Sequence, residues 1–446
     1  MTVRCDLLVR GASEVVTMVP GAGAATPAGP VSAAVDLGVV ARGAVAARDG
    51  RVVWTGPEAE IAAVLEVPDD ALVVDVEGAA VVPGFVDAHT HLVWAGERAA
   101  EYGARLAGAT YLEVQETGGG INSTVRATRA ATEERLAALA ARRLDSFLRH
   151  GTTTLEAKTG YGLTLEDERK SLAAAKVAHP VRRVHTALAA HLTPEEYAGR
   201  DDEYIDLVCD QILPTLAGQA EFVDVFCDEG AFSVAQARRV LIAGAAAGLG
   251  LRIHADELAR SGGSMLAAEL GCASADHLIH ATWEEVAAMK AAGVVAVMLP
   301  GTSYTLGVGF APARAFLEAG VTIALASDLN PGSCYCENLQ MMISLACQGM
   351  KLTPDEALHA ATVGGAAALR RDDVGSLEVG KRCDFSVLVA ESRSELPYHF
   401  GVNLVGDVVV GGRVAVQDGV AVHGVPAPEP GPLSARDVFR APGGVA

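Results

Sequence analysis

The chain has 446 residues, half of them hydrophobic, with 55 acidic against 35 basic residues and a formal net charge of −20. This composition argues against global disorder, and the hydrophobic fraction is ample for a globular core. The acidic balance argues against nucleic acid or an anionic membrane as a partner, and an anionic substrate would need a local cation.

The sequence shows neither a membrane-spanning pattern nor a signal-peptide pattern. No uninterrupted apolar run reaches the roughly 18 residues of a membrane span, and the first ten residues lack a signal-peptide pattern. Of the eight scattered cysteines, Cys334 and Cys336 form the one close pair, and their C-x-C spacing is not that of a zinc ribbon or redox motif. We therefore expect a cytoplasmic protein with reduced thiols.

Residues 1–80 predict the N-terminal part of a small β-domain. Turn signals such as Asp49-Gly50 separate short β-rich runs at 5–9, 44–47, 51–54 and 71–76. A stretch rich in Pro, Gly and Ala at 19–31 predicts a mobile loop.

Residues 81–365 alternate apolar β-rich runs with helical patterns. The helices begin at recognisable caps, which are Thr132, Ser233, Thr282 and Thr353. The eight strand candidates are 81–86, 152–156, 184–188, 222–226, 251–255, 273–277, 294–299 and 321–326. This alternation predicts an α/β fold, a TIM-like (β/α)8 barrel. An open doubly wound sheet is the competing interpretation, but its Gly-rich phosphate fingerprint follows none of these strands.

Residues 366–425 return to a β pattern, with runs at 384–389, 408–410 and 413–416. We expect this C-terminal part to pair with the N-terminal strands, so that the two chain ends build one small β-sandwich domain beside the barrel. Residues 426–446 are rich in Pro, Ala and Gly and predict a flexible tail.

Five of the twelve histidines follow apolar runs at strand ends, where (β/α)8 barrels carry their active sites. They are His89, His91, His191, His254 and His277. His89 and His91 are two residues apart, so their side chains point to the same side of an extended strand end.

The histidines and one aspartate predict a mononuclear metal site. Three imidazoles, from His89, His91 and His254, and the carboxylate of Asp328 suit Zn²⁺ or Fe²⁺ with an open position for water. The alternatives are a core histidine for His254 and a helix N-cap for Asp328. Lys158, expected past the end of its strand, could instead bridge two metals as a carbamate, but we favour one metal.

Glu257 lies three residues past His254 and could serve as the proton shuttle for a water activated by the metal. His277 could hydrogen-bond the same water, and with Asp328 these residues form the expected catalytic set. The alternatives are a solvated loop carboxylate for Glu257 and a structural hydrogen bond for His277.

The run from Val81 to His91, VVPGFVDAHTH, resembles the opening signature of the amidohydrolase superfamily. Four further stretches resemble the imidazolonepropionase family within it, at 91–98, 118–121, 151–162 and 327–333. Shorter agreements lie at 254–257, 275–277 and 299–302, so the resemblance spans nearly all of the predicted barrel.

This resemblance implies metal-dependent hydrolysis of the cyclic amide of 4-imidazolone-5-propanoate to N-formimidoyl-L-glutamate, in histidine degradation. It implies one Zn²⁺ or Fe ion per subunit and a homodimer. It also implies metal ligation by His89, His91, His254 and Asp328, with Glu257 and His277 handling the water and its proton. The implied substrate contacts are Arg98, Tyr161, His191, Glu257, Asn330, Gly332 and Ser333.

The residues themselves agree with an anionic substrate. Arg98 follows His91 by seven residues and could bind a carboxylate through a bidentate fork, although an ion pair with Glu97 or Glu101 is the alternative. Tyr161 stands between two glycines, so we expect a flexible loop there and no core role. His191 could be structural. Cys334 stands where serine is common in the family and is expected to confer sensitivity to oxidation.

Two other functions remain open at this point. A deaminase of a purine- or pyrimidine-like ring could use the same metal ligands with Glu257 and His277, and only Arg98, Tyr161 and the Gly-rich stretch at 118–120 argue against it. A non-catalytic scaffold or binding member of the superfamily is the alternative of another class. Such proteins usually lose metal ligands, and none is missing here.

Overall fold

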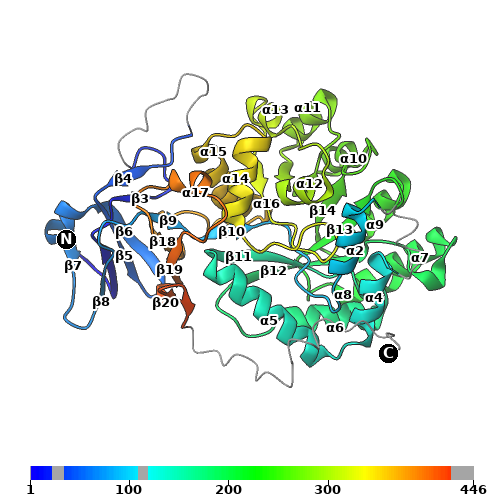
Figure 1. Cartoon of the computed structure of the whole chain (residues 1–446), viewed down its shortest axis with the longest axis horizontal. Helices are drawn as coiled ribbons and strands as arrows, with labels where there is room; N and C mark the ends of the chain where they lie inside the picture. Colours follow the sequence, from blue (N-terminus) through cyan, green and yellow to red (C-terminus); the bar gives the residue numbers. More distant parts are fainter. Residues whose placement is uncertain (1, 23–34, 109–118, 423–446) are drawn as a thin grey trace.

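The computed structural model describes residues 2–22, 35–108 and 119–422 (Figure 1). Most of the loop predicted at 19–31, Gly118 of the Gly-rich stretch and the whole tail predicted at 426–446 lie outside these described residues. Within them, no helix combines the length and apolar character needed to cross a membrane.

A parallel sheet of eight strands forms the centre of the molecule, and each strand pairs with the next in chain order. The strands are β10 (Phe85–Asp87), β11 (Thr152–Lys158), β12 (Arg182–Ala190), β13 (Phe222–Cys227), β14 (Gly250–Ala255), β15 (Ser274–His277), β16 (Val295–Met298) and β17 (Ile323–Leu325). Just beyond β10 and β17, Thr90 and Leu329 form a parallel bridge that brings the first and last strands together. The predicted TIM-like barrel is confirmed, and the open sheet is not observed.

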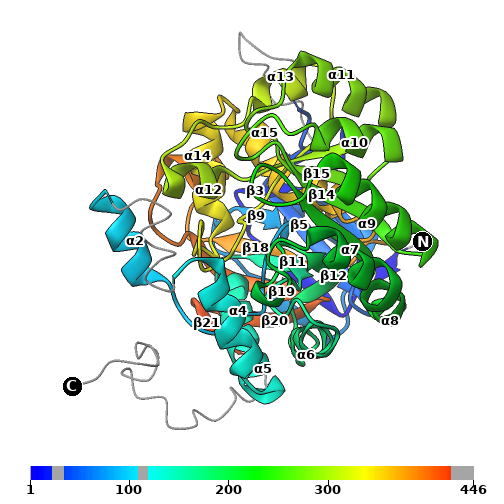
Figure 2. The same cartoon turned by 90° about the vertical axis from the view of Figure 1, so that its right-hand side faces the viewer.

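Helices surround these strands (Figure 2). The Thr132 side chain accepts a hydrogen bond from the N–H of Arg135, and Ser233, Thr282 and Thr353 begin capping boxes, so the predicted helix starts are confirmed. The longer barrel helices are α5 (Glu133–Arg149), α6 (Leu165–Ala175), α7 (Asp201–Leu207), α9 (Val234–Ala246), α10 (Gly263–Leu270), α11 (Trp283–Ala292), α12 (Pro300–Leu306) and α14 (Leu339–Gly349). Two further helices, α2 (Ala99–Leu106) and α4 (Ile121–Ala130), lie between β10 and β11 in the chain.

The two chain ends build a second unit beside the barrel (Figure 1). One sheet has the order β21 (Val420–Ala421), β20 (Arg413–Gln417), β19 (Val405–Val410), β18 (Phe385–Leu388), β9 (Val81–Pro83), β3 (Glu14–Val16) and β4 (Val39–Ala41). The other has the order β6 (Arg51–Pro57), β5 (Gly43–Arg48), β2 (Leu7–Arg10) and β8 (Leu72–Asp75). Leu7 and Val45 of one sheet share a buried core with Val15 and Phe385 of the other. The predicted β-sandwich from both ends is confirmed.

The run predicted as one strand at 81–86 is divided between the two units. β9 pairs with β18 in the sandwich, whereas β10 pairs with β11 in the barrel. The division falls at Gly84, where a Cβ would overlap the side chain of Thr153. Glycine therefore lets the chain pass close to β11 as it moves from the sandwich into the barrel.

Candidate active site

Four side chains meet just beyond the C-terminal ends of β10 and β17 and at the end of β14. Asp328 Oδ1 lies 3.4 Å from His89 Nε2 and 3.5 Å from His91 Nε2, and His254 Nε2 lies 3.5 Å from His91 Nε2. Ligands about 2.0–2.2 Å from one tetrahedral metal ion lie roughly 3.3–3.6 Å from one another. The three measured separations have the length expected between neighbouring ligands of one metal ion. His89, His91 and Asp328 meet as one group of possible ligands, and His254 lies beside His91.

The buried polar atoms support a metal at this point. Among the described residues, His89 Nε2 has no hydrogen-bond partner although it is fully buried, and such an atom is costly unless something binds it. Burial, with Lys158 and the neighbouring histidines, holds the pKa of His89 well below its usual range. The imidazole is thus neutral, as metal ligation requires, and the donor set fits Zn²⁺ or Fe²⁺.

Carboxylates hold the other nitrogens of two imidazoles. His89 Nδ1 lies 2.6 Å from Asp276 Oδ2, and His254 Nδ1 lies 3.1 Å from Asp224 Oδ1. A proton on Nδ1, shared with a carboxylate, leaves Nε2 as the atom that can bind a metal. Sequence reasoning missed Asp224, since it is one charged residue inside the apolar run of β13.

Lys158 is not where the sequence placed it. β11 continues to Lys158, whose side chain is fully buried, so the expectation that it lies past the strand end is wrong. Its ammonium lies 2.8 Å from Glu156 Oε2 and 2.5 Å from Asp224 Oδ2. Because these contacts require a charged lysine, they argue against a carbamate that bridges two metals.

Glu257 and His277 lie beside the proposed metal ligands. Glu257 Oε2 is 3.5 Å from His277 Nε2, and the His277 ring centroid is 5.3 Å from that of His254. Glu257 is 9% exposed, so it is not a solvated loop carboxylate. Burial, together with Asp328 and Asp228, raises the pKa of Glu257 well above its usual range. A raised pKa favours the protonated form of a carboxyl group more than usual, which suits a group that exchanges a proton with a reacting water.

The loops that carry these residues are tightly held. Asp228 Oδ2 accepts hydrogen bonds from the N–H groups of Glu257 at 2.6 Å and Leu258 at 3.0 Å. His277 and Asp328 have φ of 79° and 52°, in the left-handed region. Non-glycine residues in this region are concentrated at functional sites, where surrounding contacts enforce the strain.

Asp328 has a second partner that sequence reasoning did not single out. Thr302, on α12, donates a hydrogen bond from Oγ1 to Asp328 Oδ2 at 2.5 Å. The short agreement at 299–302 was the signal that could have identified it. Because Thr302 binds Oδ2, the other oxygen of Asp328, Oδ1, is the one that faces His89 and His91.

Tyr161 and His191 flank His91. Their ring centroids lie 5.8 and 5.1 Å from that of His91. Tyr161 is 3% exposed and belongs to the barrel core, so the expectation that it has no core role is wrong. Its loop is ordered by the Glu168 carboxylate, which accepts the Gly162 N–H at 2.9 Å. His191 Nδ1 lies 2.9 Å from the Gly160 carbonyl, which is the structural contact considered for it.

Arg98 reaches the turn at 330–333. Its Nε donates to Glu101 at 2.8 Å, the ion pair considered as its alternative role, and a Cβ at Gly332 would overlap its Nη1. Asn330 Oδ1 accepts the N–H groups of Gly332 at 2.8 Å and Ser333 at 2.7 Å. The turn residues therefore lie beside the guanidinium.

Cys334 follows this turn but is only 2% exposed. Burial, with nearby Asp328, raises the pKa of its thiol well above the usual range. Since the thiolate is the reactive form, the structure argues against the predicted sensitivity to oxidation.

The sequence profile of the amidohydrolase family matches residues 80–415. The imidazolonepropionase of Symbiobacterium thermophilum is 48% identical over 422 residues, which cover 93% of this chain and 98% of that protein. The chain belongs to the imidazolonepropionase family. A second member, from Geobacillus kaustophilus, is 46% identical over the same shares of both chains. Members of this family are hydrolases, and these matches favour neither the deaminase nor the scaffold alternative.

Solved structures agree with the family on the fold. An adenosine deaminase from Xanthomonas campestris with bound zinc has a TM-score of 0.71 and is 22% identical, covering 98% of this chain and 97% of that one. At this identity the likeness concerns the fold alone. The family profile and the His/Asp cluster support a metal cofactor.

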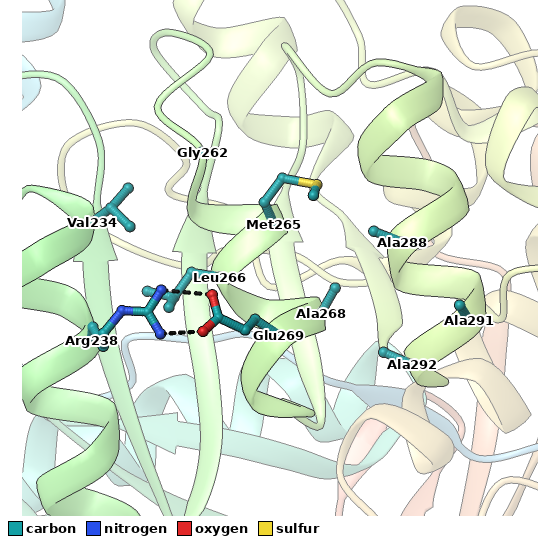
Figure 3. A pocket seen from close by; sticks show the side chains of 10 residues that line it. All are labelled: Val234, Arg238, Gly262, Met265, Leu266, Ala268, Glu269, Ala288, Ala291 and Ala292. Atoms are coloured by element: carbon teal, nitrogen blue, oxygen red, sulfur yellow. Dashed lines mark hydrogen bonds and ion pairs between the residues drawn. The ribbon is translucent and has the colours of Figure 1, made fainter.

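A pocket of about 560 Å³ lies elsewhere, on the outside of the barrel among α9, α10 and α11 (Figure 3). Four alanines, one glycine and the apolar residues Val234, Met265 and Leu266 line it, and its charged groups are the paired Arg238 and Glu269. It contains none of the motif residues of the imidazolonepropionase family, so the barrel mouth remains the candidate active site.

Proposed function

We propose that this protein hydrolyses the cyclic amide of 4-imidazolone-5-propanoate to N-formimidoyl-L-glutamate, a reaction of histidine degradation. One Zn²⁺ or Fe ion would be held by His89, His91, His254 and Asp328. The observation that carries this proposal is the buried cluster of ligand atoms 3.4–3.5 Å apart, in a chain nearly half identical to named imidazolonepropionases.

When bound, the metal would act as a Lewis acid and lower the pKa of a coordinated water. Glu257 would accept the proton from the attacking water and deliver it to the ring nitrogen as the carbon–nitrogen bond breaks. His277 would hydrogen-bond the reacting oxygen and keep it in line with the carbonyl carbon. The raised pKa of Glu257 supports this role, since the group must bind and release a proton in each turnover.

The substrate's propionate would bind Arg98, because a guanidinium recognises a carboxylate through two parallel hydrogen bonds. Tyr161 and His191 would contact the ring on the side of His91. Asn330, Gly332 and Ser333 form the turn beside the Arg98 guanidinium and would therefore shape the propionate end of the site, outside the reacting centre.

The direct test is turnover of 4-imidazolone-5-propanoate, made in situ from urocanate with urocanase and followed by loss of ring absorbance. We expect rapid loss that chelation abolishes and Zn²⁺ or Fe²⁺ restores. His254→Ala should lose metal and activity together. No turnover by a protein shown to hold one metal per chain would contradict the proposal, and ammonia release from purine- or pyrimidine-like rings would then support a deaminase.

We also propose a homodimer, a cytoplasmic location and domain boundaries near residues 80 and 365, by analogy with the family and from the sequence pattern. Multi-angle light scattering should give twice the chain mass. A single species at the chain mass over the micromolar range would contradict the dimer.

A further inference from the structure

Five buried charged residues lie beneath the proposed metal site and take no part in the proposed proton transfers. This buried charge network consists of Glu156, Lys158, Asp224, Arg252 and Asp276, each at most 1% exposed. Burying ion pairs of this kind seldom stabilises a fold more than apolar residues of similar volume would. Stability therefore does not explain the network, and its position suggests a role in the site.

The network is continuous and reaches two proposed metal ligands. Lys158 Nζ contacts Asp224 and Glu156, and Arg252 Nε lies 2.9 Å from Glu156 Oε1 while its Nη2 lies 3.2 Å from Asp276 Oδ2. The carboxylates of Asp224 and Asp276 then contact the Nδ1 atoms of His254 and His89, respectively, as hydrogen-bond acceptors.

We propose that Lys158 is a positioning residue. By holding Asp224 through Oδ2 it fixes the carboxylate whose Oδ1 binds His254 Nδ1, and so it sets the tautomer and ring orientation that present His254 Nε2 to the metal. This inference rests on the proposed metal site and adds a residue that acts through His254 without touching the substrate.

The charges in the network let the direction of the change in metal affinity distinguish positioning from simple electrostatics. Three carboxylates and two cations leave a net charge of −1, and Asp328 brings the buried charge facing the metal to −2. Through space, the Lys158 ammonium repels a metal cation, so its loss would tighten metal binding if electrostatics alone mattered. Loss of positioning would instead weaken binding, because partners of ligating histidines are worth about 10- to 100-fold in metal affinity.

Two variants separate these effects. Lys158→Met removes the ammonium alone and leaves a carboxylate unpaired. The double variant Glu156→Gln with Lys158→Met removes one charge of each sign, so the net charge of the network is unchanged. Asp224 then loses Lys158 but keeps His254, and Arg252 loses Glu156 but keeps Asp276. Asp167→Asn with Lys170→Met is the matched control, since this pair, 2.7 Å apart, lies on α6 outside the network.

The measurement is the zinc dissociation constant of each metal-free protein, obtained by competition with a chromogenic chelator. We expect about 10- to 100-fold weaker binding in both Lys158 variants, no change in the control, and an altered cobalt(II) absorption spectrum in the double variant. Equal or tighter zinc binding by the double variant, shown to be folded by its thermal transition, would overturn the proposal.

A second measurement needs no variant. Imidazole ¹⁵N chemical shifts of the metal-free wild type should show His254 protonated at Nδ1, and protonation at Nε2 would overturn the proposal. The absolute zinc affinity of the wild type tests the metal site itself. The ratio of the zinc dissociation constants of variant and wild type tests the role of Lys158. The proposed metal site and the proposed role of Lys158 can therefore fail separately.

Discussion

Glu257 sits at the barrel mouth on a loop whose N–H groups are bound by Asp228. Glu257→Gln preserves the shape of the side chain and its neighbours but removes the group that would accept a proton. We expect full metal content and a fall in kcat on the order of 10²-fold or more, as for other general acid–base residues. Elemental analysis and steady-state kinetics check this. Glu229→Gln, at an exposed residue of the neighbouring loop, is the control and should keep the wild-type rate.

Arg98 should determine affinity for the anionic end of the substrate. Hydrogen bonds to a charged group contribute about 1.5–3 kcal/mol, so Arg98→Ala should raise KM by roughly 10- to 100-fold. The effect on kcat should be smaller, because the propionate does not react. Arg126→Ala, which breaks an exposed ion pair with Glu195, is the control. An unchanged KM for the Arg98 variant would remove Arg98 from the substrate site.

At the scale of elements, α11 begins with a cap that responds to pH. Glu285 accepts hydrogen bonds from Thr282 and from Arg260, whose Nε lies 2.9 Å away. Burial alone would raise the pKa of Glu285, but these partners lower it from its ordinary 4.5 to about 2. Because the folded-state pKa is the lower one, Glu285 stabilises the fold above pH 4.5, and this contribution is lost as the pH falls towards 2.

Glu285→Gln should therefore destabilise the protein by about 1–2 kcal/mol at pH 7, because the amide oxygen can still accept from Thr282 but the charge that pairs with Arg260 is lost. The difference from the wild type should shrink as the pH is lowered below 4.5, which denaturant titrations at pH 7 and pH 3.5 would measure. Glu284→Gln, at the exposed partner of Arg260, should cost less. A destabilisation that does not change with pH would contradict the role of the Glu285 charge.

At the scale of the whole molecule, the seam between the first and last barrel strands is covered by a π-helical turn, η4 (Ala360–Gly364), and by α16 (Gly365–Ala368). A Cβ at Gly364 would overlap the carbonyl oxygen of Ile323 in β17, and one at Gly365 would overlap that of Val86 in β10. The two glycines therefore allow one turn to pack directly on both strands of the seam.

Gly365→Ala should destabilise the protein by about 1–3 kcal/mol, as overpacking of a close contact does. Urea denaturation measures this change. Gly103→Ala is the control, since Gly103 lies inside α2 with open space around its Cα. That change should be neutral or stabilising, because alanine favours helix by up to about 1 kcal/mol. Equal stability of both variants would show that the seam tolerates a Cβ.

The sequence by itself determined the barrel, the sandwich and the identity of the proposed metal ligands. Apolar periodicity and helix caps are local properties, and strand ends can be read from them, so His89, His91 and His254 could be assigned to one mouth. Asp328 was found in the same way. The tertiary structure decided which buried groups meet. It divided the first predicted strand at Gly84, because the strand's partners, β18 and β11, are distant in sequence.

It also placed Lys158 against Asp224, 66 residues away in the chain. A charged residue inside an apolar strand carries no local sign of its partner, because that partner comes from the neighbouring strands of the closed barrel. For this reason the histidines of the site were visible in the sequence, whereas the carboxylates and cations that orient them became visible only in the fold.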